Sequence, residues 1–241
     1  AIKLQPMEWN NYHILGFSYY DKKEYDQAII ALKEAIRLKP DEWWNYNLLG
    51  ASYRDKREYD LAIETLKEAI RLSPGEWGNY RLLGASHWDK GEYDLALEAL
   101  REAIGLKPNE WSNYSNLGGV YLETKDYDKA ISAYEKALAL KPEAEYVSIV
   151  KENLTIAHLK RLTELNPADS GNITRYNQLG EIYQEKGAYH KARQAYERAS
   201  QLNPSLKILQ EKIEEVKSKL DQEDEDENRR MEWILSGPPG G

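Results

Sequence analysis

A 34-residue period constrains this chain more than any other feature of its sequence. Trp9, Trp43, Trp77 and Trp111 are each 34 residues apart, and the motif W-x-N-Y-x-x-L-G begins at each of them. Each of these units ends in a proline, at position 40, 74, 108 or 142. A period of this length is typical of repeat proteins, in which one supersecondary unit is stacked on the next.

Within each unit, the spacing of apolar and small residues predicts two helices. The first helix of the first unit has them at i, i+3, i+4 and i+7, namely Tyr12, Leu15, Gly16 and Tyr19. The second helix has them at i, i+4 and i+7, namely Ala28, Leu32 and Ala35. Each set lies on one helical face. Because Gly16 and Ala28 are small, we expect the two helices to approach closely.

The ends of the helices are also marked in the sequence. Proline ends each second helix. We expect the residue after the proline, which is Asp41, Gly75 or Asn109, to be the N-cap of the next helix. The tryptophans and asparagines of the motif recur in every unit, so we interpret them as structural. His87 stands where other units have tyrosine, and we interpret it as a core residue.

These patterns resemble the tetratricopeptide repeat (TPR) family. The large apolar residue, leucine, glycine and tyrosine of the family's first helix match the first-helix residues named above, and its closing proline matches Pro40. A further copy is formed by Tyr176, Leu179, Gly180, Tyr183, Ala192, Tyr196, Ala199 and Pro204. The resemblance implies an all-α fold, a right-handed superhelical solenoid of antiparallel helix pairs.

The repeat divides the chain into nine segments. Residues 1–6 are interpreted as the end of a truncated upstream repeat, 7–42, 43–76, 77–110 and 111–142 as units one to four, 143–172 as a degenerate helical unit and loop, 173–204 as unit five, 205–220 as a capping helix and 221–241 as an acidic linker and hydrophobic tail. Because 1–6 match 35–40, we expect the chain to begin inside a repeat of a longer protein. The sequence of residues 143–172 predicts either a single long helix or a shortened helix pair. We interpret this segment as a decayed repeat or as a hinge that changes the direction of the superhelix.

Composition and motifs argue against several classes of function. No stretch approaches the ~20 consecutive apolar residues that a membrane helix needs, so we expect no membrane insertion. The net charge of −8 argues against nucleic acid as a partner. The chain has no cysteine, no metal-binding histidine pair and no phosphate-binding or nucleophile motif. We therefore expect no catalytic residue, no cofactor and no metal, and we expect a cytoplasmic, non-enzymatic protein.

The family resemblance implies a concave peptide-binding groove lined by the first helices. The family's inner positions are the second, fifth, sixth, ninth, twelfth and thirteenth of each unit. From these positions we take fifteen candidate groove residues: Asn10, His13, Phe17, Tyr20, Trp44, Asn47, Arg54, Arg81, Trp88, Asp89, Ser115, Asn116, Leu122, Asn177 and Glu181. The thirteenth residue is acidic in all five units, which predicts a negative rim. The lysine, asparagine and arginine clamp of chaperone-tail binders is missing, which disfavours an adaptor of that type.

Three functions fit these observations. The first is a protein–protein interaction scaffold that binds a peptide or helical segment of a partner in the groove. The second is a targeting or regulatory TPR domain of a larger enzyme. The third is a self-associating scaffold that uses the uncapped first repeat or the tail 229–241, in which two arginines precede Trp233, Ile234 and Leu235.

Overall fold

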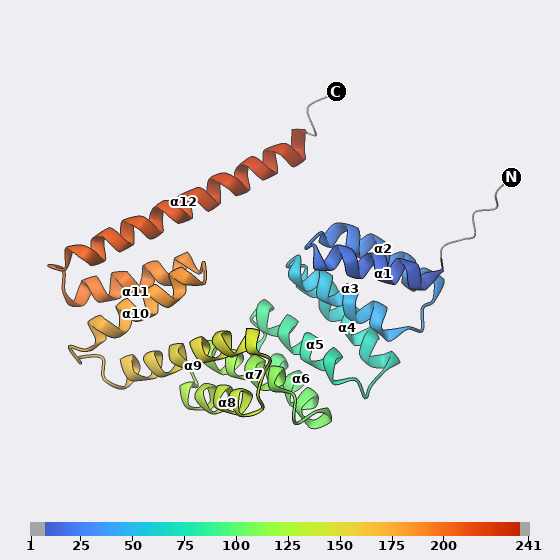
Figure 1. Ribbon diagram of the computed structural model, residues 1–241, viewed down its shortest axis with the longest axis horizontal. Helices are drawn as coiled ribbons and strands as arrows, with labels where there is room; N and C mark the ends of the chain where they lie inside the picture. The colour runs from blue at the N-terminus through green and yellow to red at the C-terminus, as the bar shows by residue number, and fades with distance from the viewer. Residues whose placement is uncertain (1–7, 237–241) are drawn as a thin grey trace. The chain divides into compact units, whose positions relative to one another are not determined.

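The computed structural model describes residues 8–236, and every regular element in that range is an α-helix (Figure 1). The first eight helices form four consecutive pairs: α1 (Trp9–Asp21) with α2 (Tyr25–Leu38), α3 (Trp43–Asp55) with α4 (Tyr59–Leu72), α5 (Trp77–Lys90) with α6 (Tyr93–Leu106), and α7 (Trp111–Glu123) with α8 (Tyr127–Ala139). The all-α class and the stacking of helix pairs are confirmed. The segment 1–6, interpreted as an upstream repeat, lies outside the described residues.

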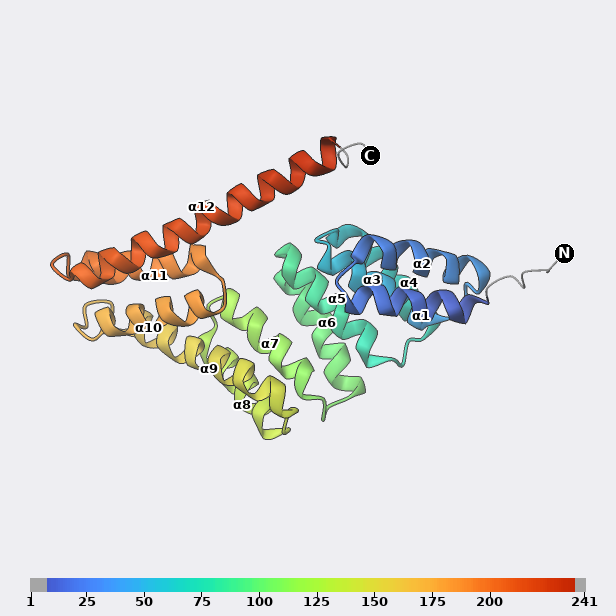
Figure 2. The ribbon, with the colours of Figure 1, turned by 45° about the horizontal axis from the view of Figure 1, so that its top comes forward.

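The remaining helices are α9 (Ala144–Leu165), α10 (Asn172–Glu185), α11 (Tyr189–Leu202) and α12 (Lys207–Ser236). The chain divides into two compact units, Ala1–Lys151 and Glu152–Gly241, with the boundary inside α9. In the second unit, α10 packs on α11, and α12 packs on α11 (Figure 2). No helix of the described part has the length and apolar character needed to span a membrane.

The helices of each pair are held close by a glycine of the first helix and a large residue of the second. A Cβ atom added to Gly16 would lie 2.7 Å from Cγ of Leu32. Gly50 faces Leu66 and Gly84 faces Leu100 in the same way. The three leucines are all completely buried, which stabilises each by about 2 kcal/mol relative to exposure. The expected close approach of the two helices is therefore confirmed.

The turn within each pair is built on one residue with positive φ. In units one and two this residue is Lys23 (φ 61°) or Arg57 (φ 65°), and in unit three it is Gly91 (φ 84°). The backbone N–H after it bonds back to the first helix, as Glu24 N does to Tyr19 O at 2.9 Å. This left-handed closure ends the first helix and turns the chain into the second.

The structure corrects the predicted N-caps. The residue after the proline lies in a turn, and the cap is the glutamate that follows it, Glu42, Glu76 or Glu110. In α5 the Glu76 side chain accepts a hydrogen bond from Gly78 N at 3.3 Å. A carboxylate at this point also lies at the positive end of the helix dipole.

Two segments near the C-terminus differ from the expected organisation. Residues 144–165 form one 22-residue helix, so the alternative of a shortened pair is not realised. The acidic stretch 221–227, expected to be a linker, belongs to α12. Glutamate and glutamine have good helix propensity, and Arg229 pairs with Asp226 one turn away, so the charged segment continues the helix.

The inner side of α12 also differs by one residue from the expected capping helix. Leu209, Ile213, Val216 and Leu220 are buried, at i, i+4, i+7 and i+11. The helical spacing of Ile208 with Ile213, Val216 and Leu220 in the sequence predicts Ile208 on this face, but the structure leaves it 54% exposed. The cap is therefore present, rotated so that Leu209 takes the place predicted for Ile208.

Candidate functional site

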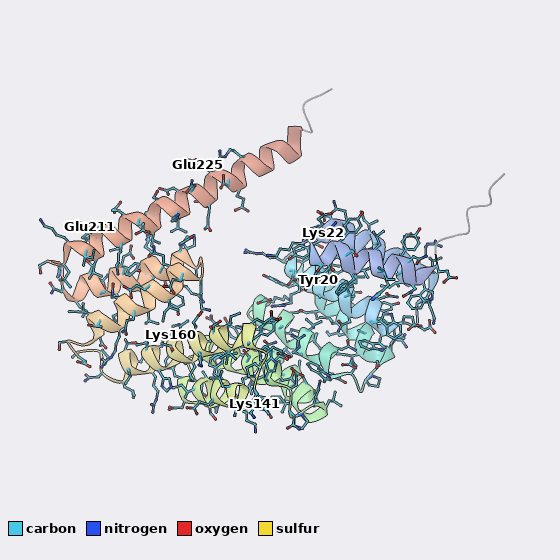
Figure 3. The ribbon with its side chains drawn as sticks, viewed as in Figure 1. Tyr20, Lys22, Lys141, Lys160, Glu211 and Glu225 are labelled. Atoms are coloured by element: carbon cyan, nitrogen blue, oxygen red, sulfur yellow. The ribbon has the colours of Figure 1, made fainter. Side chains whose placement is uncertain are left out.

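The candidate residues of units one to four lie on four helices that contact one another in series. Contacts join α1 to α3, α3 to α5 and α5 to α7. We call the surface that these helices share the first-helix face. Figure 3 labels Tyr20, near the C-terminal end of α1, as one residue of this face. The second helices α2, α4, α6 and α8 pack behind it and supply most of the buried alanines and leucines.

All fifteen candidate residues are at least partly accessible. Exposed side chains are those of Asn10, Phe17, Trp44, Asp89 and Glu181. Half-buried ones are those of His13, Tyr20, Asn47, Arg54, Arg81, Trp88, Ser115, Asn116, Leu122 and Asn177. Thirteen of them belong to the first compact unit, whereas Asn177 and Glu181 belong to the second.

Two large aromatic side chains of the first-helix face are held exposed by their neighbours. Phe17 is 53% exposed and Trp44 is 38% exposed. The Trp44 ring lies 5.8 Å from that of Trp43 and 6.1 Å from that of Trp9, between centroids. Because Trp44 is braced on both sides, it offers apolar area with little rotamer entropy to lose on binding.

Trp88 has a different role from Trp44. It packs against the core cluster of Leu100 and Val120. A Cβ atom added to Gly119 would lie 2.2 Å from Cη2 of Trp88, so only glycine leaves room for this ring at the start of the next unit. Leu82 stands at the sixth position of unit three, which the family resemblance places on the inner surface, but the structure buries it. Trp88 therefore contributes to packing between units as well as to the face.

Two residues of the predicted negative rim, Asp55 and Asp89, are bonded within the protein. The twelfth residue of one unit bonds the thirteenth residue of the next: Tyr20 Oη donates to Asp55 at 2.7 Å, and Arg54 Nε donates to Asp89 at 2.7 Å. Burial, and then the bond to Asp55, raise the pKa of Tyr20 above its usual range. Asp55 and Asp89 therefore help to hold neighbouring units in register.

A second ladder of side-chain bonds joins the units, and it was not predicted. The fifth residue of one unit reaches the buried motif asparagine of the next: His13 Nδ1 lies 2.7 Å from Asn45 Oδ1, and Asn47 Nδ2 donates to Asn79 Oδ1 at 2.7 Å. Asn79 in turn donates to the carbonyl of Ala69 near the end of α4. The only hint of this ladder in the sequence was that the asparagine recurs in every unit. The interpretation of this asparagine as structural holds at these buried positions.

His87 occupies the position that the sequence analysis assigned to the core. Its side chain is buried, and Nδ1 lies 2.6 Å from Oε2 of Glu92 in the turn that follows. Lys90 Nζ also bonds Glu92, at 2.6 Å. The bonds from Lys90 and then His87 lower the pKa of the Glu92 carboxyl. This trio closes the turn of unit three.

The two candidate residues of the second unit are engaged by α12. Lys212 Nζ lies 2.9 Å from Asn177 Oδ1 and 2.6 Å from Glu181 Oε1. A pocket of about 610 Å³ adjoins this bond and is lined by residues of α10, α11 and α12. Burial, and then the charge of Glu181, raise the pKa of Tyr196 in this pocket to about 12. In this unit α12 thus covers surface that the repeat pattern assigned to a ligand.

No cluster of three or more potential metal ligands occurs in the part of the chain that the structure describes. The histidines there are dispersed over different helices, and two of them, His13 and His87, take part in the structural bonds given above.

Comparison with known proteins agrees with the observed architecture. Family models described as tetratricopeptide repeat match residues 9–42, 45–76, 81–145 and 174–206. The fold is similar to the crystal structure of the APC/C hetero-tetramer Cut9–Hcn1, with a TM-score of 0.63 and 19% identity over 89% of this chain and 44% of that chain. This chain thus spans less than half of that relative. No curated protein matches it.

Two further solved structures cover most of their own length. A thermophilic TPR protein of Thermus thermophilus aligns with a TM-score of 0.56 and 20% identity, over 86% of this chain and 98% of that one. The MamA protein aligns with a TM-score of 0.50 and 27% identity, over 81% and 92%. Because the family matches fall on the units seen as helix pairs, the chain belongs to the tetratricopeptide repeat family.

Proposed function

We propose that this chain is a non-catalytic scaffold that binds an extended or helical segment of a partner protein on the first-helix face. The observation that supports this most directly is the exposure of the large aromatic side chains of Phe17 and Trp44 on the first-helix face. Exposed aromatic groups next to polar neighbours are typical of interaction surfaces, where they supply most of the binding energy.

The polar groups of the face also favour recognition over catalysis. Asp55 and Asp89 are bonded to Tyr20 and Arg54, so these carboxylates are occupied by structural partners. The short contact between His87 and Glu92 is partly buried, and Glu92 also bonds Lys90. A catalytic acid or base needs access to its substrate, whereas these groups are used to fix turns and neighbouring units.

The test is to remove the exposed aromatics and measure peptide binding. Twelve-residue random peptides displayed on phage are selected on the immobilised chain, and the affinities of selected peptides are measured by fluorescence anisotropy. We expect Phe17→Ala with Trp44→Ala to weaken binding about tenfold or more, because two apolar anchors are lost. Trp88 is left intact because its removal would disturb packing between units.

A matched control variant removes two apolar side chains of similar exposed fraction from the second helices. Leu61 and Leu95 are 44% and 46% exposed on α4 and α6. The double variant Leu61→Ala with Leu95→Ala should bind the selected peptides with unchanged affinity. If the leucine variant loses binding and the aromatic variant keeps it, the ligand lies on the second helices and the proposal is wrong.

Self-association is a second candidate, favoured by the first repeat. Ile14 is 54% exposed and Leu15 is 36% exposed, whereas Leu49, the counterpart of Leu15 in unit two, is 5% exposed. Light scattering over a range of protein concentrations tests this, with deletion of 229–241 as the second arm. Placement of the tail side chains 230–241 lies outside the described residues. The alternative of a regulatory domain of a larger enzyme stays a prediction.

A further inference from the structure

The ladder between the fifth residue of one unit and the motif asparagine of the next is interrupted at unit three. The two preceding steps are hydrogen-bonded, His13 to Asn45 and Asn47 to Asn79, each at 2.7 Å. At the next step the fifth residue is Arg81 and the asparagine is Asn113. Here Arg81 Nε and Asn113 Oδ1 are both buried without a hydrogen-bond partner.

Arg81 also lacks a carboxylate. Among the side chains that the structure describes, none forms an ion pair with its guanidinium. The guanidinium makes a cation–π contact with the ring of Trp77, with 5.7 Å between Cζ and the ring centroid. A largely buried cation with no counter-charge is costly, and proteins normally compensate it with an anion and hydrogen bonds.

The nearby carboxylates are already engaged. Asp89 accepts from Arg54, Asp55 accepts from Tyr20, and Glu110 lies 3.1 Å from Lys107 Nζ. Burial lowers the pKa of the Arg81 guanidinium, and the charge of Arg54 lowers it further. A bound anion would oppose both effects; the charge of Glu110 also opposes them, but this carboxylate is already paired with Lys107.

We propose that Arg81 is the subsite for a carboxylate of the bound peptide, an aspartate or glutamate side chain in the middle of the segment. This inference rests on the proposed function and specifies its ligand. Arg81 lies on α5, with Phe17 and Trp44 on the helices before it and Asn116 on the helix after it. A segment that crosses the face therefore continues on both sides of Arg81, which favours an internal carboxylate over a terminal one.

Unit two supplies a matched variant for Arg81. Asn47 occupies the same position there and bonds Asn79. Arg81→Asn should recreate that bond with Asn113, because both asparagines would then stand as they do one unit earlier. We expect this variant to melt at the same temperature as the wild type or higher, while it loses preference for acidic peptides. A purely structural arginine would give the opposite result, a lower melting temperature.

The binding experiment selects random 12-residue displayed peptides on wild type and on Arg81→Asn. We expect aspartate or glutamate to be enriched at one internal position with the wild type and not with the variant. A selected peptide is then synthesised with that acid, with its amide, and with a free or amidated C-terminus. Replacing the acid by its amide should weaken binding to the wild type about tenfold or more and leave binding to Arg81→Asn unchanged.

The outcomes separate this inference from the proposed function. If peptides depend on Phe17 and Trp44 but show no acidic preference, the scaffold function stands and the Arg81 subsite is overturned. If C-terminal amidation removes the Arg81-dependent affinity, a terminal carboxylate is the ligand group and the internal placement is wrong. If no peptide binds above background, the proposed function and this inference both fail.

Discussion

At the scale of single residues, the turn between paired helices carries a conformational constraint that recurs in each unit. One position must adopt positive φ, where a Cβ atom is unfavourable and glycine is at no disadvantage. Units three and five place Gly91 and Gly187 there, whereas units one, two and four place Lys23, Arg57 and Lys125. The units therefore share one backbone conformation at this turn but differ in its conformational free energy.

This difference predicts that Arg57→Gly stabilises the protein by about 0.5–1 kcal/mol. Arg57 has φ 65°, and its side chain forms no hydrogen bond or ion pair with the described residues, so little is lost. The reciprocal change Gly91→Ala should destabilise by about 1 kcal/mol or more. Urea denaturation followed by circular dichroism measures both, and a stabilising Gly91→Ala would contradict the explanation.

At the scale of elements, a helix pair depends on the fit of one large side chain against one glycine. A Cβ atom added to Gly50 would lie 2.6 Å from Cγ of Leu66, which is fully buried in α4. The leucine cannot move without displacing its neighbours, because protein interiors are close-packed. The glycine of the motif is thus required for packing and not for a turn.

We therefore expect Gly50→Ala to destabilise the protein by about 1–3 kcal/mol through overpacking. Gly105, in α6, is the matched control, because nothing lies within 4 Å of the Cβ position there. Gly105→Ala should be neutral or stabilise by up to about 1 kcal/mol, the helix-propensity difference. Thermal denaturation compares the two, and equal effects would contradict the packing argument.

At the scale of the whole molecule, the two compact units differ in how many repeats support one another. Residues 1–151 contain four stacked pairs, so α3 to α6 have neighbours on both sides. Residues 152–241 contain one pair, α10 with α11, together with α12 and the end of α9. In repeat proteins stability is a sum over units and the interfaces between neighbours, so we expect the second unit to be the less stable.

Hydrogen exchange measured by mass spectrometry tests this expectation. Amides of α4 and α6 should exchange slowest, and amides of α10 and α11 should exchange at least tenfold faster under the same conditions. Val216, which is fully buried where α12 covers the last pair, provides the control. Val216→Ala should speed exchange in the second unit alone. Uniform protection across both units would contradict the division.

The sequence by itself determined that each unit forms two helices and that these approach closely at the motif glycine. It did so because the period of 34 residues repeats the same apolar spacing four times, and each spacing lies within a single helix. The exposure of Phe17 and Trp44 agrees with the inner positions that the family resemblance implied. Predicted caps were wrong by one residue, because propensity does not distinguish a turn residue from the cap beside it.

Only the tertiary structure decided how side chains of adjacent units meet. The bonds from Tyr20 to Asp55 and from Asn47 to Asn79 join residues 35 and 32 apart, on different helices. Which side chains bond to each other depends on how the units stack, and residue spacing within one helix does not reveal this. For the same physical reason, the sequence showed an arginine at position 81, and only the three-dimensional packing showed that its Nε is buried without a hydrogen-bond partner among the described residues.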